Sequence, residues 1–144
     1  MSQPLEQPVP QGRYVPAVRH VDVVYTSGMT PRRGGVLMFT GPIAAGDALE
    51  QHRDAVRLAT QNALVAAQGC VGDGERIAVV LQLTVFLAAE SGFTSHSKVA
   101  DFASEVLVEE LGPACIGSRA AIGVSSLPAG APVEVTLVCA VRRG

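Results

Sequence analysis

Residues 76–87 read Arg-Ile-Ala-Val-Val-Leu-Gln-Leu-Thr-Val-Phe-Leu, an apolar run rich in β-branched residues. Apolar and polar residues alternate so weakly in this run that we expect a central β-strand with both faces buried. The wider apolar stretch from Ile77 to Ala89 is interrupted by Gln82 and Thr84. It is also shorter than the roughly 20 residues that a membrane-spanning helix needs. The sequence therefore predicts a core strand and no membrane span.

One helix is expected on each side of this strand along the chain. The first covers Asp47 to Gln68, because Asp47 and Glu50 form a capping-box pattern and apolar residues then recur at helical spacing. The second covers Thr94 to Leu111, with most of its charged side chains on one face and Gly112-Pro113 as its end.

Short strands are expected outside the helices. Their predicted ranges are 14–18, 22–27, 36–40, 118–124 and 133–141, with a strong turn at Pro31 to Gly35. The resulting order β-β-β-α-β-α-β-β indicates an α+β domain, a largely antiparallel sheet with two helices on one face. The other face needs cover, and the simplest cover is another copy of the chain.

The chain has 144 residues, which is enough for one domain with its own core. Residues 1–12 contain three prolines and three glutamines, so we expect a flexible N-terminal arm before a domain at 13–144. Hydrophobic residues make up 48% of the chain against 17% charged, a composition that favours a homo-oligomer. No signal-peptide pattern is visible, so the expected location is the cytoplasm.

Composition argues against several classes of function. Three widely separated cysteines fit reduced thiols better than a disulfide framework or a zinc knuckle, and the three histidines lack metal-ligand spacing. The net charge is −2 and the chain has no Trp, whereas nucleic-acid binders usually show a basic patch or stacking aromatics. Arg32-Arg33 beside Gly34-Gly35 is typical of a solvated turn. No phosphate-loop or dinucleotide fingerprint is present.

Two charged residues stand inside the apolar strands near the C-terminus, Arg119 and Glu134. A charge in such a run costs free energy unless it is paired or used. The turn signal at 126–130 lies midway between Arg119 and Glu134, so a symmetric hairpin would set these residues opposite each other on adjacent strands. If another strand lies between them, they could still share one face of the sheet.

Two interpretations of this pair stay open. One is a structural ion pair at a strand edge or a subunit contact. The other is a small-carboxylate site, in which the Arg119 guanidinium binds a carboxylate through two hydrogen bonds and Glu134 holds or deprotonates a water.

Several short motifs occur together in a recognisable order. They are Gly12-Arg13-Tyr14-Val15, the segment from Val24 to Pro31, Thr84-Val85-Phe86, Ser118-Arg119, Leu127-Pro128 and Val133-Glu134-Val135. In this order they resemble the RidA/YjgF family of enamine/imine deaminases, also called the endoribonuclease L-PSP family. The resemblance covers about Gln11 to Arg142. It implies a chorismate-mutase-like fold and a cofactor-independent, metal-free homotrimer with its sites between subunits.

The resemblance also implies roles for single residues. Arg119 would bind the substrate carboxylate and Glu134 would position the hydrolytic water. Tyr14, Ser27 and Gly28 would line the same cleft, across the subunit interface from Arg119. The implied substrate is a 2-aminoacrylate-type enamine or its imine tautomer, which water converts to a 2-keto acid and ammonia.

Two positions depart from the family pattern. Ala121 stands where the deaminases usually have Cys, and Ser97 where they usually have Asn. Ala121 can contribute its backbone carbonyl, whereas loss of the Asn amide would change which substrate fits. Two other functions stay open: a non-catalytic trimer that binds small keto or amino acids at Arg119, and an RNA-cleaving enzyme, against which the acidic charge balance argues.

Overall fold

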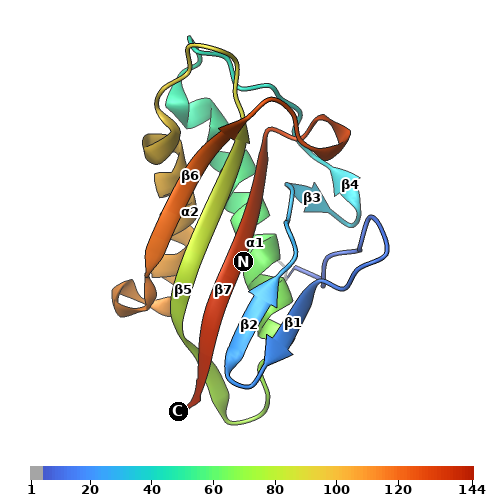
Figure 1. Ribbon diagram of the computed structural model, residues 1–144, viewed down its shortest axis with the longest axis vertical. Helices are drawn as coiled ribbons and strands as arrows, with labels where there is room; N and C mark the ends of the chain where they lie inside the picture. Colours follow the sequence, from blue (N-terminus) through green and yellow to red (C-terminus); the bar gives the residue numbers. More distant parts are fainter. Residues whose placement is uncertain (1–4) are drawn as a thin grey trace.

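A five-stranded mixed sheet with two helices on one face forms the fold of this computed structural model, which describes residues 5–144 (Figure 1). The strands lie in the order β1-β2-β7-β5-β6, and only the β5–β6 pair is parallel. Their bounds are β1 Ala17–His20, β2 Val23–Thr26, β5 Glu75–Ala88, β6 Ser118–Val124 and β7 Val133–Arg143. The expected α+β class with both helices on one face is confirmed.

The core lies between the sheet and the helices. Along β7, fully buried residues alternate strictly with half-buried ones from Val133 to Val141, so one face of the strand points into the core. Val133, Val135 and Leu137 face the helices and are fully buried, and the buried residues of β5 pair with them in register. The expectation that both faces of β5 are buried is wrong for the single chain. Gln82 is exposed, and Thr84 and Phe86 are only half-buried, because no helix covers this side of the sheet.

Both helices start later than the sequence pattern indicates. The helix α1 (Arg53–Gln68) follows a 3₁₀ turn η1 (Leu49–His52), and α2 (His96–Leu111) ends where expected. The capping box predicted at Asp47 does not form. Its Oδ2 instead accepts hydrogen bonds from the Ala44 N–H and from His52 Nε2, at 2.9 and 3.0 Å. The carboxylate therefore closes the preceding loop and is not available to cap the helix.

The third expected strand is not part of the main sheet. Val36–Leu37 forms β4, which pairs with β3 (Arg32–Arg33) in a separate two-stranded ribbon. Gly34 and Gly35 connect the two with φ of 60° and 81°, the positive values that a two-residue type I′ turn requires. Two further 3₁₀ turns, η2 (Pro113–Cys115) and η3 (Pro128–Gly130), precede β6 and β7.

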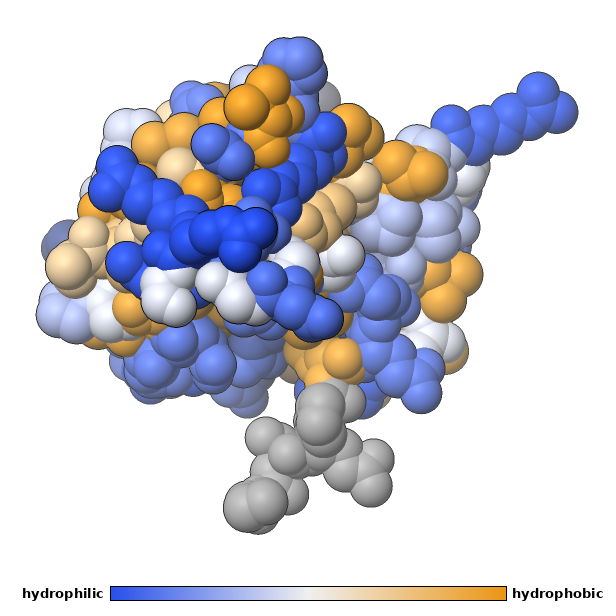
Figure 2. Space-filling view, turned by 90° about the horizontal axis from the view of Figure 1, so that it is seen from below, coloured by the Kyte–Doolittle hydropathy of each residue, from blue (hydrophilic) through white to orange (hydrophobic). Residues whose placement is uncertain are grey.

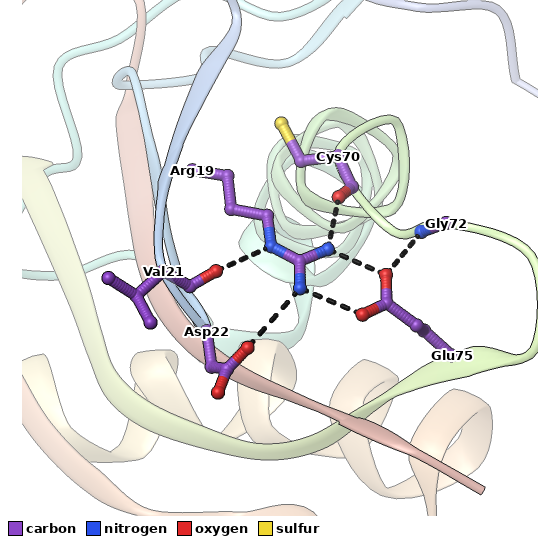
Figure 3. Close-up of polar contacts among 6 residues, drawn as sticks. All are labelled: Arg19, Val21, Asp22, Cys70, Gly72 and Glu75. Carbon is purple, nitrogen blue, oxygen red and sulfur yellow. Dashed lines mark hydrogen bonds and ion pairs between the residues drawn. The ribbon is translucent and has the colours of Figure 1, made fainter.

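An arginine clasp closes one end of the molecule (Figure 3). Arg19 on β1 binds both carboxylate oxygens of Glu75, at 2.6 and 2.8 Å, and also donates to the carbonyls of Val21 and Cys70. It thereby ties the β1–β2 turn to the loop between α1 and β5. The hydrogen bonds from Arg19, and a further one from the Gly72 N–H, lower the pKa of Glu75 to about 2.

The uncovered side of the sheet, here called the open face, carries exposed apolar residues. Val18 and Tyr25 are 54% and 50% exposed, and they stand in one row with the half-buried Val138. Ile122 on the edge strand β6 is 42% exposed. In Figure 2 the open face lies along the upper side of the view, where hydrophobic residues stand among hydrophilic ones, and hydrophilic residues extend across the middle. This face is suited to contact with another molecule.

Three other expectations concern the chain as a whole. Residues 5–12 form neither helix nor strand, and Gln7 Nε2 donates to the Val65 carbonyl of α1 at 2.7 Å. Residues 1–4 of the expected N-terminal arm lie outside the described part, and the flexibility of the arm stays a prediction. Cys70, Cys115 and Cys139 are free thiols, as expected. Within residues 5–144, no helix has both the length and the apolar character that crossing a membrane requires.

Candidate functional site

Glu134 lies on the open face, because it is out of phase with the buried Val133 and Val135 on β7. Its carboxyl group rests against Gly28, so closely that a Cβ at position 28 would lie 2.6 Å from Glu134 Cδ. Glu134 has no hydrogen bond or ion pair with any residue of the described chain. Partial burial without a compensating partner raises its pKa above the ordinary glutamate value. Such a carboxylate is a stronger base than one in bulk water.

Arg119 lies on the opposite side of the sheet and is bound by α2. Its Nη1 donates to Asp101 Oδ1 at 2.7 Å and to Ser104 Oγ at 3.0 Å. Its Nη2 donates to the Ser97 hydroxyl at 2.8 Å and to the Ser97 carbonyl at 3.1 Å. These four bonds use both terminal nitrogens fully, and the side chain is only 22% exposed.

The predicted meeting of Arg119 and Glu134 does not occur within one chain. The strand β5 lies between β6 and β7, because β6 pairs parallel to β5 and its connection to β7 crosses over. Arg119 aligns with Leu83, which faces the helices, whereas Glu134 aligns with Phe86 on the open face. Two strand spacings and three residues along β5 separate their Cα atoms by about 14 Å. The hairpin and the shared face are therefore both wrong.

The expected site residues instead divide into two groups. The first, here the α2 half-site, consists of Ser97, Arg119 and Ala121. Ser97 contacts Arg119 directly, and Ala121 follows two residues later on the same face of β6, half-buried against the core.

The second group, here the Gly28 half-site, consists of Tyr14, Ser27, Gly28 and Glu134. Tyr14 and Gly28 line one pocket of about 340 Å³, which residues of the 5–11 segment and the β3–β4 hairpin enclose. The Ser27 hydroxyl donates to the Val15 carbonyl at 2.7 Å, so it holds the segment before β1 against the end of β2. This hydrogen bond matches the strand-end role that a lone serine usually has.

Sequence reasoning missed the residues that hold Arg119 and those that build the pocket. Asp101 and Ser104 follow Ser97 by four and seven residues, and this helical spacing could have placed all three on one face of α2. Arg32 and Arg33, expected as a solvated turn, line the pocket, and Arg32 Nε is buried without an acceptor among the described residues. No sequence signal distinguished them from ordinary turn residues.

The chain is similar in sequence and in fold to several known proteins. The family model for endoribonuclease L-PSP matches residues 5–141. The chain is 31% identical over 128 residues to Protein TCP17 of Trypanosoma cruzi, which covers 88% of this chain and 79% of that protein. A solved protein of Shewanella oneidensis MR-1, whose name gives only the endoribonuclease class, shares 28% identity and a TM-score of 0.85 over 96% of this chain and 91% of its own. Atu1372 of Agrobacterium tumefaciens, described as of unknown function, shares 28% identity and a TM-score of 0.81 over 93% of this chain and 86% of its own.

Proposed function

Because the chain belongs to the endoribonuclease L-PSP family, we propose that it hydrolyses reactive enamine and imine intermediates of the 2-aminoacrylate type to 2-keto acids and ammonia. The observation that supports the proposal most directly is the environment of the Glu134 carboxyl group. It is a partly buried carboxylate with a raised pKa, it has no partner in residues 5–144, and it stands on a face that no helix covers. An unpaired carboxylate in this position is suited to hold a water and take its proton.

The reaction needs three contributions that the two half-sites can supply together. Arg119 binds the substrate carboxylate, which fixes the C=N carbon in position. Glu134 accepts a proton from the water as its oxygen adds to that carbon. That proton passes to the imine nitrogen, which gives a carbinolamine. Glu134 then carries the hydroxyl proton of the carbinolamine to the same nitrogen as the C–N bond breaks, so ammonia leaves and the C=O bond of the keto acid forms. No electron acceptor enters the balance.

The two half-sites of one chain cannot act on one small substrate, since the sheet separates them. We therefore infer that the site is completed by a second copy, with the α2 half-site of one subunit against the Gly28 half-site of the next. The exposed apolar residues of the open face and the unpaired edge of β6 support a homotrimer of this kind. Light scattering should then give about three times the chain mass of 14.9 kDa.

A coupled assay tests the proposed activity. An amino-acid oxidase generates imino acids in situ, and release of ammonia and keto acid is followed with and without the protein. Wild type should accelerate release, and Glu134→Gln should lose most of the acceleration while it still binds a carboxylate. Glu110→Gln is the matched control, because Glu110 is an exposed glutamate on α2 that forms no hydrogen bond or ion pair with either half-site.

The same preparations distinguish the alternatives. Binding of keto acids without any acceleration would favour a non-catalytic carboxylate-binding trimer. Cleavage of RNA that survives in Glu134→Gln, with no effect on imines, would favour the endoribonuclease. Either result would overturn the deaminase proposal.

A further inference from the structure

The guanidinium of Arg119 is already occupied in the single chain. Both N–H groups of Nη1 and both of Nη2 are bound by Asp101, Ser104 and Ser97. A two-pronged carboxylate contact needs two N–H groups of one guanidinium. Within the described part of the chain, only the Nε–H of Arg119 is without an acceptor. A substrate carboxylate must therefore replace at least one resident acceptor.

The resident acceptors differ in how easily they can leave. The Ser97 carbonyl belongs to the first turn of α2 and is fixed by the helix backbone. Asp101 is the acceptor at the rim, since its side chain is 64% exposed whereas that of Arg119 is 22% exposed. An exposed carboxylate regains water when it leaves, so this ion pair is weak. It is also the only acceptor of the four that carries the charge of a substrate carboxylate.

We propose that Asp101 is a resident stand-in for the substrate, a carboxylate that occupies Arg119 in the empty site and is displaced when the substrate binds. This proposal rests on the proposed function of Arg119. Departure of Asp101 frees an Nη1 N–H, and rotation of the Ser97 hydroxyl frees one on Nη2. The Ser104 hydroxyl and the Ser97 carbonyl keep the guanidinium in place.

The displacement of Asp101 from Arg119 predicts which class of substrate can bind. A ligand that displaces a charged acceptor from Arg119 must offer a full negative charge in exchange. Imino acids with a free carboxylate meet this condition. Amides and esters of the same acids leave Arg119 with its own aspartate. The site would thus act on free imino acids and reject neutral or peptide-bound ones.

Titration calorimetry with pyruvate and its neutral analogue pyruvamide tests the proposal. Removal of the competitor in Asp101→Asn should tighten pyruvate binding by up to about fivefold, the worth of an exposed ion pair. In the deaminase assay KM should fall without a rise in kcat. Glu110→Gln removes the same charge from the same helix without a contact to Arg119, and its pyruvate affinity should stay at the wild-type value. Pyruvamide should not bind wild type measurably.

The outcomes separate this inference from the function on which it rests. If wild type deaminates imines but Asp101→Asn binds pyruvate no more tightly, or more weakly, then Asp101 is not a competitor and the inference is wrong. Pyruvamide binding equal to that of pyruvate would also overturn it. If wild type neither binds pyruvate nor releases ammonia, the proposed function fails and the inference fails with it. Melting temperatures of both variants identify any loss due to unfolding.

Discussion

Replacement of Gly28 by alanine should move the Glu134 carboxylate without disturbing the fold. The added Cβ would lie 2.6 Å from Glu134 Cδ and closer still to Oε2. Ordinary contact begins at 3.4 Å, so the carboxyl group must withdraw by at least 0.8 Å, the difference between these distances. The obstructing atoms are the end of a flexible side chain, so the backbone can remain in place. Misplacement of a reacting group by about 1 Å can cost roughly 10²-fold in rate.

We therefore expect Gly28→Ala to lose about two orders of magnitude in turnover while its melting temperature stays close to that of wild type. The assay is keto-acid release from imines made by an amino-acid oxidase. Gly46→Ala is the matched control, since no atom lies within 4 Å of the Cβ that it adds. In a Glu134→Gln background, Gly28→Ala should lower turnover little further, because both substitutions act on the side chain at position 134. Wild-type turnover in Gly28→Ala, or an additive loss in the double variant, would refute the reasoning.

Three further outcomes are expected. Arg119→Lys should lose at least about tenfold in turnover, because one ammonium cannot replace a planar guanidinium that bonds to Ser97, Asp101 and Ser104 at once. Turnover equal to that of wild type would show that only the positive charge matters. Stability should fall as the pH drops from about 4.5 toward 2, because the pKa of Glu75 is lowered in the folded state, and melting curves of Glu75→Gln should show a flatter acid decline. Glu134→Gln should melt no lower than wild type at neutral pH, because burial disfavours its charged form; a large decrease would reveal a structural ion pair.

Local patterns predicted the elements well. The β6 range from Ser118 to Val124 agrees with the sequence prediction, and α2 ends at Leu111 as expected. The end of α2 is set by a short-range feature, the Gly112-Pro113 stop that follows it. The start of α1 was missed because the Asp47 side chain bonds within its own loop, a local competitor that the capping pattern does not exclude.

The candidate site was predicted only in part, because strand pairing is a long-range property. The outward direction of Glu134 is encoded locally, because it stands on β7 between two valines that face the core. The neighbours of Arg119 could not follow from the same pattern. They depend on β6 pairing parallel to β5, which sets Arg119 beside α2 and away from Glu134. The hairpin interpretation failed at this step.

The central claim is that each site combines Arg119 of one subunit with Glu134 of another, and mixed assemblies test it most directly. Arg119→Ala and Glu134→Ala should each be inactive alone. When the two variants are unfolded together and refolded at equal amounts, a cyclic assembly contains some interfaces with both residues intact. Random mixing should restore roughly a quarter of the wild-type rate. No recovery, in samples whose mixed composition native mass spectrometry has verified, would contradict the account.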